Sequence, residues 1–223
     1  MNCIVGLDLG QQNDFTAISV LDVIPSKYTR QVPDIDSEIG VPLTRTMIVE
    51  APPLSFHVTH LERLPIGTSY VRVVERVRQV MASLPGGTEL VVDNTGVGRP
   101  VTDMILQQGL NPVCITITGG ETVTRDGRNF HVPKRDIVSV LAVAFQNKQL
   151  KIAKSLPEAQ TLVSELLNFK VKINLKTAHD SYAAWREGTH DDLILSVGLA
   201  AWAAHYIYTY QESAIALEDN YQI

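Results

Sequence analysis

Residues 3–22 read CIVGLDLGQQNDFTAISVLD, and this stretch decides the fold. The apolar residues on either side of the turn-rich GQQND predict two strands that pair as a hairpin. Asp8 interrupts the first of these strands, with no turn signal before Gly10. An isolated carboxylate in a core strand is costly to bury, so Asp8 needs a partner and a functional reason. Asp14 lies close enough in sequence to join it, although an acid at that place is more typical of a turn.

The rest of the chain first continues as strand and then alternates between helix and strand. Part of 45–56 is expected to form a third strand, and the Pro-rich, polar segment within 22–45 is expected to be a loop insertion. Hydrophobic spacing and turn signals predict the remaining elements. The expected helices cover 68–84, 99–109, 133–149, 156–169 and 189–210, and the expected strands cover 88–93, 111–120 and 150–153. This order predicts an α/β fold with a central mixed sheet flanked by helices on both faces.

Composition limits the classes of protein that the chain can represent. Its 223 residues, 45% of them hydrophobic, suit one domain over 1–223. The net charge of -5 means that a polyanion must be bound by a local basic face or through metal ions. Cys3 and Cys114 lie in apolar runs and are expected to be reduced core thiols. No apolar run approaches the roughly 20 residues that span a bilayer, so we expect a soluble, intracellular protein without a membrane partner.

Two further groups of acids lie beside apolar segments. Asp93 ends the run ELVVD, and Asp191 with Asp192 opens the last helix. Each has a structural explanation, since Asp93 suits a turn and Asp191 or Asp192 suits a helix cap. Together with Asp8, however, they suggest a shared divalent cation with oxygen ligands, such as Mg²⁺. Two such ions hydrolyse phosphodiesters by activating a water and stabilising the leaving oxygen.

Basic residues gather in two segments near these acids. The expected DNA contacts are Arg125, Arg128, Lys134 and Arg135 in the first segment, and Lys170, Lys172, Lys176 and Arg186 in the second. Residues 171–190 are expected to form a basic hairpin or loop, because lysines alternate with apolar residues at its start. Such residues suit phosphate contacts, which carry no base specificity. Ordinary solvated faces remain the alternative. Tyr182 and Trp185 are expected to pack locally rather than stack on bases.

Three stretches together resemble the nuclease domain of the large terminase subunits of tailed bacteriophages. They are GLDLGQQNDFTAISVL (6–21), LVVDNTGVGRPVTDMI (90–105) and GTHDDLILSVGLAAW (188–202). The resemblance implies an RNase H-like fold and an endonuclease that cuts concatemeric double-stranded viral DNA with two Mg²⁺ or Mn²⁺ ions. Matched position by position, it places the metal-binding acids at Asp8, Asp93 and Asp191. Asp192 and Asp14 are auxiliary ligands in this assignment.

The chain departs from the full terminase subunit in one respect. It has no GxxxxGK[ST] motif, the loop that binds nucleotide phosphates in the ATPase motor. We therefore expect a nuclease domain alone. The resemblance implies that its partners are the motor domain, the small terminase subunit and the portal, in the cytoplasm of an infected bacterial host.

Two other enzyme classes fit part of the pattern. A Holliday-junction resolvase has the same RNase H-like fold and a similar acidic cluster. GLDLG also resembles the first phosphate loop of actin-like ATPases and sugar kinases, but THDDLILS has no role in those proteins. A DNA-binding module without activity leaves the acids unexplained.

Overall fold

A mixed sheet of eight strands forms the centre of the molecule. The computed structural model describes residues 2–10, 14–35, 42–96, 98–175 and 191–220. The strand order is β6-β7-β5-β4-β1-β2-β3-β8. Strands β1 (Asn2–Asp8), β4 (Glu89–Asp93), β5 (Val113–Thr118) and β7 (Asn129–Pro133) are mutually parallel. Their carboxyl ends therefore lie at one edge of the sheet, which we call the carboxyl edge.

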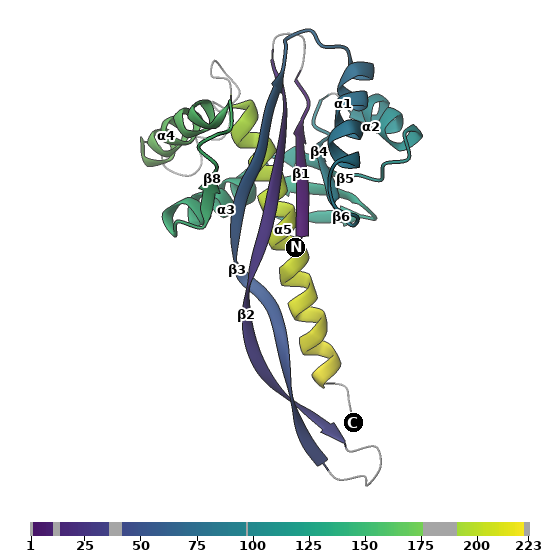
Figure 1. The fold of residues 1–223 in the computed structure, drawn as a ribbon, viewed down its shortest axis with the longest axis vertical. Helices are drawn as coiled ribbons and strands as arrows, with labels where there is room; N and C mark the ends of the chain where they lie inside the picture. Colours follow the sequence, from purple (N-terminus) through teal and green to yellow (C-terminus); the bar gives the residue numbers. More distant parts are fainter. Residues whose placement is uncertain (1, 11–13, 36–41, 97, 176–190, 221–223) are drawn as a thin grey trace.

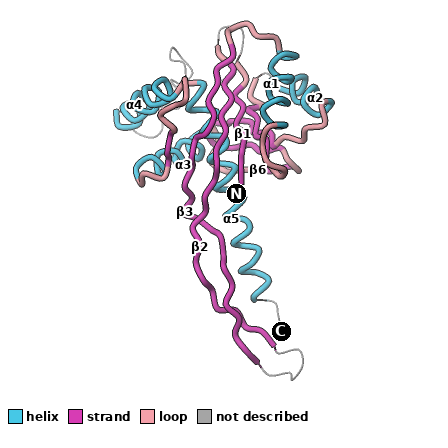
Figure 2. Tube along the Cα trace, viewed as in Figure 1, coloured by secondary structure: helices cyan, strands magenta, loops and turns pink. Residues whose placement is uncertain are grey.

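Strands β2 (Thr16–Ile35) and β3 (Pro42–Leu64) extend the sheet into a long two-stranded ribbon (Figures 1 and 2). They pair antiparallel from Thr16↔Leu64 to Ile35↔Pro42. The prediction of a loop insertion over 22–45 was therefore wrong for 22–35 and 42–45, which are strand. The prolines and polar residues of this segment are typical of a loop, which explains the wrong expectation. Pro25, Pro52 and Pro53 lie at the register shift between Pro25 and Ser26, where β3 carries extra residues and the strand pairing is interrupted.

A short hairpin formed by β7 and the outermost strand β6 was also missed in the sequence. Strand β6 (Thr124–Asp126) turns at Gly127, which has φ +58°, and pairs antiparallel with β7. Three residues are too few to show the alternation of a strand. On the other side of the sheet, β8 (Leu150–Ile152) is the outermost strand and pairs parallel with β3.

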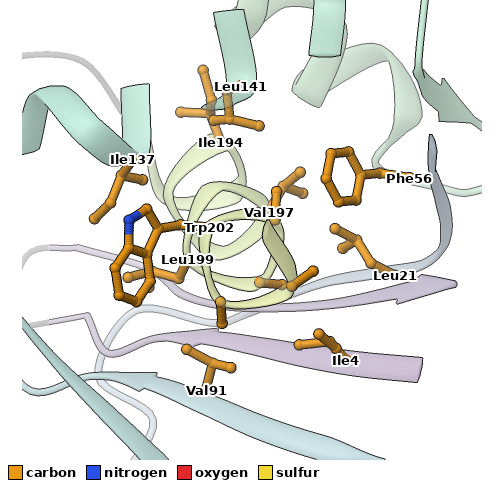
Figure 3. Packing of buried hydrophobic residues seen from close by; sticks show 14 of the residues in the cluster. Ile4, Leu21, Phe56, Val91, Ile137, Leu141, Ile194, Val197, Leu199 and Trp202 are labelled. Carbon is orange, nitrogen blue, oxygen red and sulfur yellow. The ribbon is translucent and has the colours of Figure 1, made fainter. Parts of the chain in front are cut away.

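Five helices cover the two faces of the sheet within the described residues. Helices α1 (Tyr70–Ala82) and α2 (Gly98–Gln107) pack on one face with Val5, Leu7 and Val92. Helices α3 (Lys134–Gln146), α4 (Ala159–Leu175) and α5 (Asp192–Asn220) lie on the other face. Figure 3 shows α5 between sheet residues such as Ile4 and Val91 and the α3 residues Ile137 and Leu141. Among the described helices, none combines the length and apolar character needed to cross a membrane.

Helix α5 lies directly on β1 at Gly6. A Cβ atom at this position would lie 1.9 Å from the backbone oxygen of Ser196, so only glycine permits the approach. Because side chains alternate along a strand, Asp8 shares the α5 face with Gly6 and Ile4. Gly6, two residues before Asp8, therefore allows α5 to pack against β1 close to Asp8.

Helix α4 overturns the expected conformation of the second basic segment. Residues 171–175 belong to this helix and do not form a strand or hairpin, and Lys170 and Lys172 lie within it. An alternation over only four residues is too short to distinguish a strand from one turn of a helix. Residues 176–190, including Lys176, Tyr182, Trp185 and Arg186, lie outside the described part of the chain.

Candidate active site

Two buried aspartates end adjacent parallel strands at the carboxyl edge. Asp8 is 8% exposed and Asp93 is 2% exposed. Leu7 pairs with Val92, so Asp8 and Asp93 are the next residues along strands that lie about 4.8 Å apart. Val91 belongs to the core cluster on the α5 face, and alternation places Asp93 on that face as well. Both carboxylates therefore belong to the side of the sheet that α5 covers.

The turn after β4 holds the carboxylate of Asp93 in place. Its Oδ1 accepts a hydrogen bond from the backbone N–H of Thr95 at 2.7 Å. The Thr95 hydroxyl in turn accepts the N–H of Ile117 at 2.8 Å, which ties this turn to β5. Asp93 thus has the turn role that its sequence context suggested. One carboxylate oxygen in a hydrogen-bonded turn also pre-orients the group for a ligand.

The third acid position lies at the start of α5. The backbone carbonyl of Asp191 accepts the N–H of Leu195 at 3.0 Å, so Asp191 is the N-cap residue directly before α5. Asp192 follows in the first turn and is 7% exposed. Ser196, whose backbone meets Gly6 of β1, is one turn further along the helix. The first turn of α5 is consequently anchored to the strand that carries Asp8.

A fourth buried acid, Glu165 of α4, was missed in the sequence. It is 6% exposed, and its Oε2 accepts the backbone N–H of Ile194 in α5 at 2.9 Å. Burial raises the pKa of the Glu165 carboxyl to about 8; the N–H of Ile194 opposes this rise, and the charges of Asp192 and Asp191 add to it. The available signal was an acid on the apolar stripe of a helix, since Leu162 and Leu166 beside it are buried.

Arg63 of β3 is the basic neighbour of this group. Its guanidinium pairs with Glu158 at 3.4 Å and lies 4.6 Å from the centre of the Phe15 ring. The positive charge of Arg63 lowers the pKa of Glu165, against the larger effect of burial. Arg63 pairs with Ala17, which pairs with Asp8, so all three share one row across the sheet.

The same row continues in the other direction to a second arginine. Asp93 pairs with Ile115, Ile115 with Phe130, and Phe130 with Arg125 of β6. The guanidinium of Arg125 lies 5.1 Å from the centre of the Phe130 ring, and its Nε donates to the Gly127 oxygen at 2.7 Å. In this row an arginine therefore lies on either side of the two central carboxylates, Arg63 two strands from Asp8 and Arg125 three strands from Asp93.

The remaining basic residues of the first segment divide between the two edges of the sheet. Lys134 and Arg135 begin α3 directly after β7, at the carboxyl edge, and Arg135 donates to the Glu121 oxygen at 2.5 Å. Arg128 instead donates to Glu89 at 2.5 Å and to the Asn111 oxygen at 2.8 Å. Glu89 is the first residue of β4 and Asp93 is the last. Arg128 therefore lies at the amino ends of the parallel strands, which we call the far edge, and is remote from Asp8 and Asp93.

The acids suit a hard cation in their donor chemistry, but they form no complete ligand set by themselves. Within the described ranges, no three His, Cys, Asp or Glu side chains lie close enough to hold a metal ion. Mg²⁺ needs only one or two protein carboxylates when waters and substrate phosphates complete its shell. Asp14 is exposed in the turn before β2, and its auxiliary role stays a prediction.

Comparison with known proteins identifies the fold. No protein-family model matches the sequence, and no curated protein matches it. The chain has the fold of terminase nuclease domains, which confirms the predicted RNase H-like architecture. The human cytomegalovirus terminase nuclease domain matches with a TM-score of 0.51 and 13% identity, over 94% of this chain and 86% of that chain. The large terminase nuclease from thermophilic phage G20c has 20% identity and a TM-score of 0.49, over 89% of this chain and 80% of that chain.

Proposed function

We propose that this protein is a metal-dependent endonuclease that cuts concatemeric double-stranded viral DNA during genome packaging. The observation that carries the proposal is the placement of Asp8 and Asp93 on adjacent parallel strands, buried on the face where α5 begins. Buried carboxylates on one face repel one another, and a divalent cation relieves that repulsion. The shared fold with a terminase nuclease domain agrees with this chemistry.

Three acids would hold the cations, which we propose to be two Mg²⁺ or Mn²⁺ ions. Asp8, held by a central strand, would be the shared ligand, with Asp93 and Asp191 as the further ligands. Bound ions would supply an activated water and neutralise charge on the phosphate. The protein itself orients the carboxylates: the strand fixes Asp8, the Thr95 N–H fixes Asp93, and the first turn of α5 carries Asp191.

The decisive experiment incubates the full chain with supercoiled plasmid in Mg²⁺, in Mn²⁺, or in excess chelator. We expect nicked and linear products with either metal, with Mn²⁺ at least as effective because it binds such sites more tightly. Cleavage that continues undiminished in chelator contradicts the proposal. Preference for a four-way junction over linear duplex would instead identify a resolvase.

The DNA path is proposed to follow the basic residues at the carboxyl edge, Arg125, Lys134 and Arg135. Lys170, Lys172, Lys176 and Arg186 remain proposed contacts from α4 and the segment that follows it. Arg128 is a weaker candidate, because its guanidinium is engaged with Glu89 and Asn111 at the far edge. Basic residues that contact phosphates in this way bind DNA without reading its sequence.

Replacing Arg125 and Arg135 by glutamine is expected to weaken DNA binding and flatten its dependence on salt. Each lost phosphate contact lowers the log–log slope by roughly 0.9, so the double variant should lose up to roughly 1.8. Affinity is measured at several salt concentrations in Ca²⁺, which suppresses cutting. The matched control replaces Arg72 and Arg78, which are exposed on α1 across the sheet. Equal slopes in wild type and the Arg125/Arg135 variant would place the DNA elsewhere.

The remaining assignments are proposals that follow from the same function. The partners would be an ATPase motor domain, a small terminase subunit and a portal, and the location would be the cytoplasm of the infected bacterial host. Co-purification of the chain with a motor domain from infected cells tests both assignments together.

A further inference from the structure

Helix α4 joins the sheet to the start of α5 through two buried or half-buried acids. Glu158 lies immediately before the helix and pairs with Arg63 of β3. Glu165, about two turns further along α4, accepts the Ile194 N–H of α5. Because Arg63 lies in the same cross-strand row as Asp8, this chain of contacts links the position of Asp8 to the first turn of α5.

The bond to Ile194 satisfies a group that α5 cannot satisfy itself. The first four N–H groups of a helix have no acceptor within the helix, and a buried one needs a partner from elsewhere. Ile194 is buried in that first turn, two residues after Asp192 and three after Asp191. The carboxyl oxygen Oε2 of Glu165, 29 residues earlier in the chain, supplies the acceptor.

The contacts of Glu165 support a positioning role. Its side chain is only 6% exposed, so it does not face solvent or bulk DNA. Its Oε2 accepts the Ile194 N–H, whereas its Oε1 is buried and has no hydrogen-bond partner among the described residues. A hydrogen bond that orients the neighbouring turn is therefore the function that its contacts support.

We propose that Glu165 is a positioning residue of the candidate site, which holds the first turn of α5 so that Asp191 and Asp192 face Asp8 and Asp93. The metal-binding readout of this inference rests on the proposed nuclease function, whereas the hydrogen bond to Ile194 does not. Residues that orient metal ligands in this way typically change metal affinity 10- to 100-fold when removed.

Two variants separate the reach of the side chain from its carboxyl group. Glu165→Gln keeps the length of the side chain and an acceptor oxygen but removes the ionisable group, whereas Glu165→Asp keeps a carboxyl group but shortens the reach. The same two changes at Glu75, which is exposed on α1, serve as matched controls. The measurements are hydrogen exchange of the Ile194 amide and Mn²⁺ affinity of the full chain by calorimetry.

We expect Glu165→Gln to match wild type within about twofold in both measurements. Glu165→Asp should expose the Ile194 amide to exchange and weaken Mn²⁺ binding by about 10-fold or more. Loss of Mn²⁺ affinity in Glu165→Gln equal to that in Glu165→Asp would overturn the proposal, because the carboxyl group itself, and not the hydrogen bond that it accepts, would then matter. Wild-type values in Glu165→Asp would overturn it as well.

The exchange measurement also keeps the two proposals apart. If the wild-type chain neither binds Mn²⁺ nor cuts DNA, the nuclease proposal fails. Protection of the Ile194 amide by Glu165 would still be seen or refuted in the metal-free protein. Glu165→Gln is neutral and nearly isosteric, so it provides a folded variant even where the shorter side chain destabilises the protein.

Discussion

Asp8→Asn is expected to reduce plasmid cleavage by on the order of a thousandfold, because a neutral amide is a far poorer ligand for the metal that stabilises the transition state. Asp93→Asn and Asp191→Asn should cause losses of the same order. The metal-free fold should survive, since removing one of several buried like charges relieves repulsion. Asparagine also keeps the Oδ1 acceptor used by the Thr95 N–H and remains a good residue at the start of a helix.

The measurement compares initial nicking rates in Mn²⁺, with thermal unfolding of each variant in chelator as the check on folding. Asp103→Asn, an exposed acid on α2, is the matched control and should cut at the wild-type rate. An Asp8 variant that retains wild-type activity would refute the assignment of the site. A mild loss in Asp192→Asn would leave Asp192 in a supporting role only.

Gly6→Ala is expected to lower the free energy of unfolding by about 3 kcal/mol or more, at the upper end of the range for overpacked cores. The added Cβ would lie 1.9 Å from the Ser196 oxygen and 2.9 Å from its carbonyl carbon. Backbone atoms within a packed helix cannot rotate away, so α5 must move off β1. This displacement should also shift the start of α5 relative to Asp8 and reduce cleavage in whatever fraction of the protein stays folded.

Urea unfolding of the full chain measures this effect, with Gly198→Ala in α5 as the comparison. A Cβ at Gly198 meets the Ile137 Cγ2 and Leu141 Cδ1 atoms at 2.9 Å, so it meets side chains and not backbone, and we expect a smaller loss of stability than in Gly6→Ala. Alanine also favours helix by about 1 kcal/mol over glycine, which offsets part of the strain. A Gly6→Ala variant as stable as wild type would show that α5 does not rest on β1 as described.

Much of the fold was predictable because its signals are local. The apolar strand around Asp8, the run that ends at Asp93 and the helix that follows Asp191 each depend on a short period of hydrophobic residues. The mixed sheet with helices on both faces was confirmed. The distal part of the β2–β3 ribbon was missed because its prolines and polar residues are local signals of a loop.

The sequence by itself determined which acids stand beside apolar segments, because hydrophobic period and turn chemistry act over a few residues. Only the tertiary structure decided which of these groups share a face, since that depends on strand order and on the close approach of α5 to Gly6. It likewise brought in Glu165, whose partner Ile194 lies 29 residues away. It also assigned Arg128 to the far edge of the sheet. Contacts between distant segments form when packing brings buried polar groups together, and no local pattern encodes which partner each group finds.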